Sequence, residues 1–380
     1  MDLSFTEQQN ALRKTVRDFV EREMPREWVR AFDGRDEFPH DLVRKFCDLD
    51  LARINIPKEY GGKGGDVLDL MILFEEISKR LAVLSWSLGN ILLYGNEIIS
   101  VNGSDEQRAN YLPRLAKGEI MFSFGLTEPN AGSDAASIRT KAVPEDGGWV
   151  INGNKMFITG AGVTDYTITF TRTAESKYNG ITAFIVDTKL RGYSTRPVEK
   201  LGYHGSNTCE VNYDNVRVRQ EDILGGEKGL NNGWKQEMKL LNQERLVLSS
   251  CCIGIAEAAL RDALAFAAEK IRRSAGTDTQ SLQHTLAEMA TDLEAMRQLA
   301  YSAAWKEVQK MQPVLETSMS KYFCAETAKK ICLRGINVMG ESGSLMAHDM
   351  QRYFRDILIL AIGGGTSQIQ KNILSKVLGM

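Results

Sequence analysis

The segment between residues 122 and 134 carries residue types that can hold a flat polar ligand. An apolar, strand-like run stops at Thr127, and Pro129 prevents simple continuation of that strand. The turn residues Asn130, Gly132 and Ser133 follow. Such a segment can present backbone N–H groups and two hydroxyl groups to a ligand. By itself the pattern also fits a plain strand that ends in a loop, so the rest of the chain must decide.

Length and charge limit the classes of function. A chain of 380 residues can bury a large core and suggests two or three domains. Hydrophobic residues at 43% and charged residues at 25% are ordinary for a soluble globular protein. With 47 basic and 49 acidic residues the net charge is −2, which argues against a nucleic-acid partner.

The cysteines and the N-terminal segment favour a cytoplasmic protein. The six cysteines show no C-x-x-C spacing, and Cys251 and Cys252 lie in an apolar helical run, so we expect reduced, buried thiols and no metal site. Residues 1–7 lack the basic and apolar regions of a signal peptide. No window approaches 18 uninterrupted apolar residues, which predicts no insertion into a membrane.

Residues 1–120 are predicted to form a helical domain. Ser4-x-x-Glu7 is a capping-box pattern that predicts a helix through about Glu23. Apolar residues at helical spacing predict a helix over 66–79, and a mostly apolar segment predicts a buried helix over 84–101. Shorter helices are expected over 41–50 and 106–116.

Residues 121–230 change to a period of two and are predicted to form a small antiparallel barrel or sandwich. Asn152-Gly153 predicts a tight hairpin turn between strands at 149–151 and 155–159. Four further strands are expected, over 166–172, 181–187, 194–199 and 210–218.

Residues 231–380 return to helical spacing with longer segments. Helices are predicted over 234–273, 280–310, 314–338 and 367–378. Long amphipathic helices of this kind suggest a four-helix bundle, and such bundles commonly oligomerise. The predicted fold class is therefore α+β, mostly α, with a β-domain between two helical domains.

Several motifs accompany this order of domains, the first being Leu126-Thr127-Glu128-Pro129-x-Ala131-Gly132-Ser133-Asp134. Further motifs are Tyr111-Leu112-Pro113, Asn152-Gly153-x-Lys155-x-Phe157-Ile158-Thr159, Asp214-x-Val216-x-Val218, Glu244-Arg245, Arg355-Asp356 and Gly365-Thr366-Ser367-Gln368-Ile369-Gln370. Together, in this register, they resemble the acyl-CoA dehydrogenase family. The resemblance spans essentially the whole chain. It implies FAD as cofactor, an acyl-CoA or enoyl-CoA thioester as substrate, an electron-transfer flavoprotein as redox partner, and a homotetramer built as a dimer of dimers.

The reaction that the resemblance implies removes an α-proton and transfers a β-hydride to the flavin, giving a 2-enoyl thioester. A proton beside a thioester is weakly acidic, so a placed base and a donor to the enolate oxygen are needed. The family match implies flavin contacts by the residues Phe124, Leu126, Thr127, Phe157 and Thr159. The alternatives are a core aromatic at Phe157 and an ordinary sheet threonine at Thr159.

The catalytic base is the point at which this chain departs from the commonest family pattern. Many members have a glutamate just before the C-terminal Gly-Thr-Ser, but here that position is Gly364. A second family position for the base, as in isovaleryl-CoA dehydrogenase, corresponds to Glu244. A structural carboxylate paired with Lys239 or Arg245 is the alternative, although neighbours on a helix do not face each other. Gly364 still retains the backbone N–H that holds the thioester oxygen in the family.

The residues for the far end of the cofactor depart from the family as well. Its Arg-Gln-Phe-Gly signature is absent after the long helix, so a cation from Lys270, Arg272 or Arg273 is expected to reach the pyrophosphate of FAD in a neighbouring subunit. The other expected cofactor contacts are Asn337, Gly340, Thr366 and Gln368.

Substrate contacts are expected from five residues by the same resemblance: Ser133, Ser206, Asn242, Arg245 and Gly365. Ser206 also fits an ordinary turn residue. Tyr94 and Asn96, in the segment expected to bind the acyl chain, hint at a short or functionalised acyl group.

Two other functions stay open from the sequence. Glu244 together with glycine at position 364 also resembles crotonobetainyl-CoA reductase, which runs the chemistry toward the saturated product. A catalytically silent family member that serves as a subunit or scaffold is the third possibility.

Overall fold

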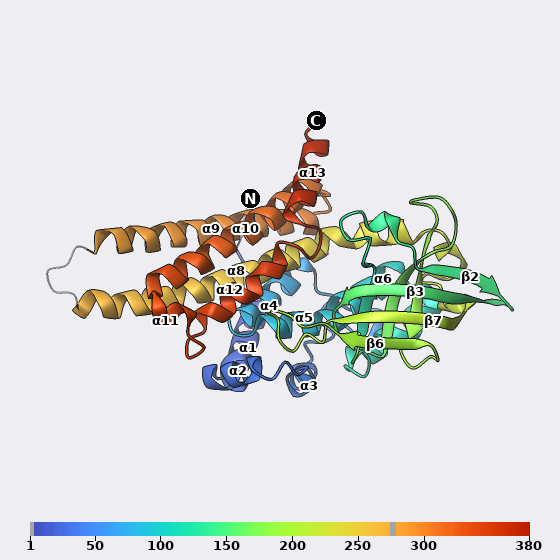
Figure 1. The fold of residues 1–380 in the computed structure, drawn as a ribbon, viewed down its shortest axis with the longest axis horizontal. Helices are drawn as coiled ribbons and strands as arrows, with labels where there is room; N and C mark the ends of the chain where they lie inside the picture. Colours follow the sequence, from blue (N-terminus) through green and yellow to red (C-terminus); the bar gives the residue numbers. More distant parts are fainter. Residues whose placement is uncertain (1–3, 274–278) are drawn as a thin grey trace.

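The computed structural model describes residues 4–273 and 279–380. A sheet lies at one end of the molecule, long helices extend from it, and the first three helices lie beside the helical part (Figure 1). The expected α+β fold, with a β-domain between two helical segments, is confirmed.

The N-terminal segment folds into short helices: α1 (Glu7–Glu23), α2 (Arg26–Asp33), α3 (His40–Asp48), η1 (Lys58–Tyr60), α4 (Val67–Ser78), α5 (Ala82–Ile91), η2 (Leu92–Glu97), α6 (Ile98–Asn102) and α7 (Asp105–Ala116). The capping box of α1 is not Ser4 with Glu7. Thr6 accepts a hydrogen bond from the backbone N–H of Gln9 instead, and the Gln9 side chain accepts one from the N–H of Thr6.

The helix expected over 84–101 is interrupted by a π-helical turn. Segment η2 has π geometry and is continuous with α5 before it and α6 after it. π-Turns are rare and are found frequently at functional sites. This one carries Tyr94 and Glu97.

The middle segment forms one mixed sheet. Its strands are β1 (Phe122–Gly125), β2 (Lys141–Glu145), β3 (Gly148–Ile158), β4 (Tyr166–Arg172), β5 (Ile181–Asp187), β6 (Tyr193–Pro197) and β7 (Cys209–Arg219). Their order is β1-β4-β2-β3-β7-β6, and β5 pairs with β4. The pairings of β4 with β1 and with β2 are parallel, so the sheet is not purely antiparallel as expected.

The hairpin predicted at Asn152-Gly153 is wrong. β3 runs straight through these residues, and the register shifts between Ile151 and Gly153, which marks a bulge. The tight turn lies at Asp146-Gly147, where φ is 47° and 78°, and it joins β2 to β3. Aspartate followed by glycine suits this turn, because both of its central positions need positive φ.

The C-terminal segment is built on three long helices, α8 (Gly233–Arg273), α9 (Gln280–Val308) and α10 (Val314–Met339). They run side by side, and α8 also passes beside the sheet domain (Figure 1). The shorter helices α11 (Glu341–Ser344), α12 (Met350–Leu360) and α13 (Ser367–Val377) follow, and α12 packs on α8 and α10.

The cysteines agree with the prediction of free thiols. All six are unpaired, and five are buried, while Cys47 is partly exposed. Across the described residues there is no helix with the length and apolar character to cross a membrane. The same part of the chain holds no cluster of three or more side chains suited to a metal ion.

Candidate active site

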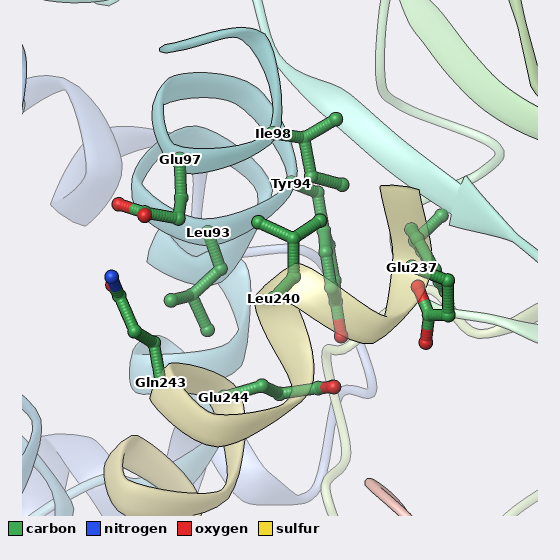
Figure 2. A pocket seen from close by; sticks show the side chains of 9 residues that line it. Leu93, Tyr94, Glu97, Ile98, Glu237, Leu240, Gln243 and Glu244 are labelled. Atoms are coloured by element: carbon green, nitrogen blue, oxygen red, sulfur yellow. The ribbon is translucent and has the colours of Figure 1, made fainter. Parts of the chain in front are cut away.

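Glu244 lies in a pocket between the first turns of α8 and the π-turn η2 (Figure 2). The pocket is small and partly open to solvent. Leu93, Tyr94 and Glu97 line it from η2, and Phe124 lines it from β1. Tyr94 and Phe124 stack with their ring centroids 5.3 Å apart. The residues expected to form the acyl site and the expected base are thus brought together.

The Glu244 carboxyl is held in surroundings that suit proton exchange. Burial raises the pKa of Glu244, against the opposing influence of Arg245, Lys321 and a hydrogen bond from the Tyr94 hydroxyl. The hydroxyl of Tyr94 points toward this carboxylate in Figure 2. A carboxylate with a raised pKa is better matched to a weakly acidic carbon than an ordinary surface glutamate.

Gly364 faces Glu244 directly. A Cβ atom built on Gly364 would lie 4.0 Å from Cδ of Glu244 and only 2.4 Å from Cδ1 of Leu248. The φ of Gly364 is 64°, a left-handed conformation that glycine adopts without strain. The two possible positions of the base therefore open onto the same space, and in this chain only the position on α8 carries a carboxylate.

The loop around Gly364 is anchored through its carbonyl groups. The Gln370 side chain donates to the carbonyl oxygens of Gly364 and Gly365, at 3.1 Å each, and Lys321 donates to Gly365 at 2.6 Å. Burial lowers the pKa of Lys321 to about 8. No acceptor among the described residues takes a hydrogen bond from the Gly364 backbone N–H.

The loop that follows β1 is fixed by a buried ion pair. Lys155 of β3 is fully buried and donates to Glu128 at 2.8 Å and to the carbonyl oxygen of Leu126 at 3.0 Å. Glu128 also accepts hydrogen bonds from the backbone N–H groups of Arg139 and Thr140. Burial alone would raise the pKa of Glu128, but Lys155 holds the pKa below its usual value. The segment from Leu126 onward is thus a rigid loop.

Comparison with known proteins gives the family. Three family models match, described as the acyl-CoA dehydrogenase N-terminal domain over residues 6–119, middle domain over 123–216 and C-terminal domain over 231–379. The chain belongs to the acyl-CoA dehydrogenase family. It is an oxidoreductase acting on acyl-CoA with FAD as cofactor, as the resemblance in the sequence implied.

Relatives in this family carry names for both directions of the chemistry. The 3-(aryl)acrylate reductase of Clostridium sporogenes is 38% identical, with 98% of each chain covered. The caffeyl-CoA reductase-Etf complex subunit CarC of Acetobacterium woodii is 35% identical, covering 98% of this chain and 99% of the relative. The solved butyryl-CoA dehydrogenase of Megasphaera elsdenii superposes with a TM-score of 0.94 at 32% identity, with both chains fully covered.

The surface beside the β1 loop fits the flavin of FAD. Phe157 is 60% exposed at φ 61°, so its ring is uncovered and is not the core aromatic of the alternative prediction. Thr159 follows two residues later and is buried. The backbone N–H of Met156 donates to Thr127 at 2.8 Å, which fixes Phe157 beside the loop. An exposed aromatic ring next to a rigid polar loop is what an isoalloxazine ring would cover.

The residues expected at the adenine end lie far from this site. Arg272 follows Glu244 by 28 positions on one helix, which separates them by about 42 Å along its axis. Its guanidinium pairs with Glu269 of the same helix. Asn337 and Gly340 end α10, also away from Glu244, and Gly340 has φ 59°. The Arg273 side chain lies outside the described residues. Whether they reach a cofactor held by another copy stays a prediction.

Thr366 and Gln368 begin α13 directly after the glycine loop. Thr366 is the N-cap, and its hydroxyl accepts a hydrogen bond from the backbone N–H of Ile369 at 3.2 Å. Gln368 is exposed on the first turn. Both keep donors that a ligand could use, but neither lines the Glu244 pocket.

The expected substrate residues differ in where they lie: some are near the site or exposed, and others are buried away from it. Ser133 is exposed on the loop, and Asn242 and Arg245 lie on the same turn of α8 as Glu244, with Arg245 buried. Ser206 is only 1% exposed, and its hydroxyl pairs with Thr208 at 2.9 Å. That placement favours the structural alternative for Ser206. Asn96 is also buried and donates to Ala52 and Asn55, so its amide does not face an acyl group.

Two acidic residues of the pocket were not predicted, Glu237 and Glu97. Glu237 is 4% exposed, and burial together with Glu244 raises its pKa to about 8. Burial raises the pKa of Glu97 to about 6, although the amides of Asn55 and Gln243 donate to it. The signal for Glu237 was present in the sequence, because positions 237, 240 and 244 share one face of a helix.

Proposed function

We propose that this protein is an FAD-dependent acyl-CoA dehydrogenase in which Glu244 removes the α-proton of the thioester. One observation carries the proposal: the Glu244 carboxyl has a raised pKa and its carbon lies 4.0 Å from where a Cβ on Gly364 would stand, and the Gly364 backbone N–H has no acceptor among the described residues. That pair supplies the base and the oxyanion donor that α-deprotonation of a thioester requires.

The side chains around the base have separate tasks. Tyr94 donates to Glu244 and orients its carboxylate. Gln370 and Lys321 hold the glycine loop so that the Gly364 N–H points at the carbonyl oxygen of the substrate. Leu93, Leu240 and Phe124 exclude water from the α-carbon. FAD, when bound, supplies a two-electron acceptor for the β-hydride.

The residues proposed to hold the flavin are Phe124, Leu126, Thr127, Phe157 and Thr159. Ser133, Asn242, Arg245 and Gly365 are proposed to contact the thioester or its CoA portion. We propose that an electron-transfer flavoprotein exchanges electrons with the enzyme, because a relative carries the name of an Etf complex subunit.

An enoyl-CoA reductase is the second candidate. Two relatives that align over nearly the whole chain are named as reductases, and neither the base nor the glycine loop favours one direction. In that direction protonated Glu244 returns a proton to the α-carbon. A catalytically silent subunit is less well supported, because a carboxyl with a raised pKa and a backbone N–H without an acceptor lie on neighbouring residues of the site.

An anaerobic panel of acyl-CoA and enoyl-CoA thioesters, followed by flavin absorbance, tests the proposal. The oxidised holoenzyme should lose its flavin colour with an acyl-CoA, or the reduced holoenzyme should regain it with an enoyl-CoA. The faster of these two reactions, compared at equal thioester concentration, identifies the preferred direction. A flavin-loaded enzyme that reacts with neither class across short, branched and aromatic acyl groups would contradict the proposal.

A further inference from the structure

Glu244 stands between the glycine loop and a small pocket that is partly open to solvent. A Cβ atom on Gly364 would lie 4.0 Å from the Glu244 carboxyl carbon, and Glu244 also lines the pocket between η2 and α8. A base that takes the α-proton must lose that proton before the next oxidation. With a thioester bound beside Gly364, the pocket is the side of the carboxyl from which water can reach it.

A second carboxyl of this pocket, Glu237, has no partner that would fix its proton. Its side chain lines the pocket from the first turns of α8 and is 4% exposed. Among the described residues, none donates a hydrogen bond to it, and Arg245 acts on it only through its charge. Burial and the charge of Glu244 raise the pKa of Glu237 to about 8, so this carboxyl holds a proton near neutral pH.

The Tyr94 hydroxyl connects the two carboxyls. It donates a hydrogen bond to Glu244, and the charges of Glu244 and Glu237 both act on it. In Figure 2 the side chains of Glu237 and Glu244 point toward this hydroxyl. Seven positions on α8 separate the two residues by about 10 Å along the helix axis. Side chains that lean toward each other over this span can be bridged by one hydroxyl group and a water molecule.

Glu97, the third carboxyl of the pocket, is held differently. It accepts hydrogen bonds from two side-chain amides, and its pKa is raised only to about 6. Its charge is not among those that act on Tyr94 or on Glu244, whereas Glu237 acts on Tyr94 and its own pKa responds to the charge of Glu244. Glu237 is therefore the carboxyl that is coupled to the base.

We propose that Glu237 exchanges protons with Glu244 through the Tyr94 hydroxyl and so connects the base to solvent. This inference rests on the proposed function. Before oxidation, Glu244 is ionised and Glu237 holds a proton. When Glu244 takes the α-proton, its negative charge disappears, the pKa of Glu237 falls, and Glu237 releases its proton to water in the pocket. The Tyr94 hydroxyl then gives its proton to Glu237 and takes one from Glu244, which restores the starting state. Reduction runs these steps in reverse.

Glu237→Gln tests the proposal on the flavin-loaded enzyme, because it keeps the size and neutrality of the side chain but cannot release a proton. The probes are butanoyl-CoA, 3-methylbutanoyl-CoA and 3-phenylpropanoyl-CoA, of which the one that reduces the wild-type flavin fastest is used. Two rates are measured anaerobically in D₂O: single-turnover flavin reduction, and entry of deuterium at the α-carbon of recovered acyl-CoA. Only deuterium entry needs the base to exchange its proton with solvent. The ratio of deuterium entry to flavin reduction should therefore fall by about tenfold or more in the variant.

Glu227→Gln is the matched control, since it makes the same replacement of a carboxyl by an amide on an exposed side chain of η5 (Gly226–Gly229) and should keep the wild-type ratio. An unchanged ratio in Glu237→Gln would overturn the inference, whether both rates persist or both fall together. An equally large fall of the ratio in Glu97→Gln would overturn it too, because the exchange would then not depend on Glu237 in particular. Failure of the oxidised flavin to react with these acyl-CoAs, and of the reduced flavin to react with their enoyl forms, would instead remove the proposed function and the inference with it.

Discussion

At the scale of single residues, the central feature is that one carboxylate and one missing side chain share the same space. A side chain at position 364 would start 4.0 Å from the Glu244 carboxyl carbon and would press on Leu248. A side chain at position 364 would thus compete for space with the carboxylate that α8 supplies. The glycine keeps its N–H free and its loop anchored, so the loss of a side chain there leaves the oxyanion donor in place.

Gly364→Ala is expected to destabilise the fold without removing the base. The methyl group would enter a left-handed conformation at φ 64° and would force Leu248 to move, which costs about 1–3 kcal/mol. Thermal unfolding should therefore shift downward by several degrees, while flavin reduction by substrate persists at a lower rate. Gly34→Ala is the control, because its φ is −73° and a Cβ there meets only Ala31 at 3.7 Å. Equal stability of the two variants would contradict the expectation.

The raised pKa of Glu244 predicts that the rates of acyl-CoA oxidation and of enoyl-CoA reduction change with pH in opposite directions. Burial shifts the pKa upward from 4.5, so the carboxyl keeps its proton to a higher pH than an exposed glutamate does. Oxidation of an acyl-CoA needs the unprotonated form, and its rate should rise with pH through the shifted pKa. Reduction of an enoyl-CoA needs the proton, and its rate should fall over the same interval. Single-turnover flavin kinetics across pH measure the rates of oxidation and of reduction. If both rates changed with pH in the same direction, the role of Glu244 would be contradicted.

At the scale of elements, the sequence predicted the regular segments well and the irregular ones poorly. Strands β4 and β5 were predicted with their observed bounds, because alternation and flanking turn residues define them. The prediction at Asn152-Gly153 was wrong because this dipeptide suits a β-bulge as well as a hairpin turn. Only the pairing of β3 with β7 distinguishes the bulge from the turn. The π-turn η2 has no local signature, since it depends on how α5 and α6 pack against their neighbours.

The same contrast holds for the candidate site. Motifs in register indicated Glu244, Gly364 and Phe157, and the structure brings the first two face to face. The motifs could not reveal that Ser206 is buried against Thr208, because that contact depends on how its loop packs. Glu237 lay outside every motif, although its helical spacing from Glu244 pointed to the same pocket.

The buried Lys155–Glu128 pair should control how tightly the flavin loop is held. Lys155→Met leaves the Glu128 carboxylate buried beside two backbone donors but without its cation, which costs about 3–5 kcal/mol. The variant should unfold at a lower temperature and lose FAD on gel filtration. The second substitution Glu128→Gln should recover part of the stability. Lys141→Met, an exposed change on β2, serves as control. Full FAD retention by Lys155→Met would show that the pair does not fix the loop.

At the scale of the whole molecule, α8 carries the proposed base at one end and the proposed cations for the adenine end of FAD at the other. Its first turns carry Glu244, and its last turn, about 42 Å away along the axis, carries Lys270 and Arg272. We propose a homotetramer in which these cations approach the cofactor of a neighbour. The division of the chain near residues 120 and 230 into three domains stays a prediction.

Arg272→Ala should weaken FAD binding without changing the chemistry at Glu244. The guanidinium pairs within its own helix with Glu269, so its loss costs the isolated chain little, and a fall in FAD affinity of about tenfold would reflect the neighbour. Equilibrium dialysis of FAD together with sedimentation velocity measures affinity and assembly at once. Saturating FAD should restore the turnover of the variant. Unchanged FAD affinity in an assembled Arg272→Ala variant would contradict the role of this end of α8.

The most direct measurement of the account is exchange of the α-proton of a bound thioester. Flavin-loaded enzyme incubated anaerobically in D₂O with an acyl-CoA should introduce deuterium at the α-carbon, detectable by NMR or mass spectrometry. Glu244→Gln, which keeps the size of the side chain and the hydrogen bond to Tyr94, should bind FAD and thioester yet reduce the exchange rate by about a thousandfold or more. Exchange at the wild-type rate in that variant would contradict the assignment of Glu244 as the base.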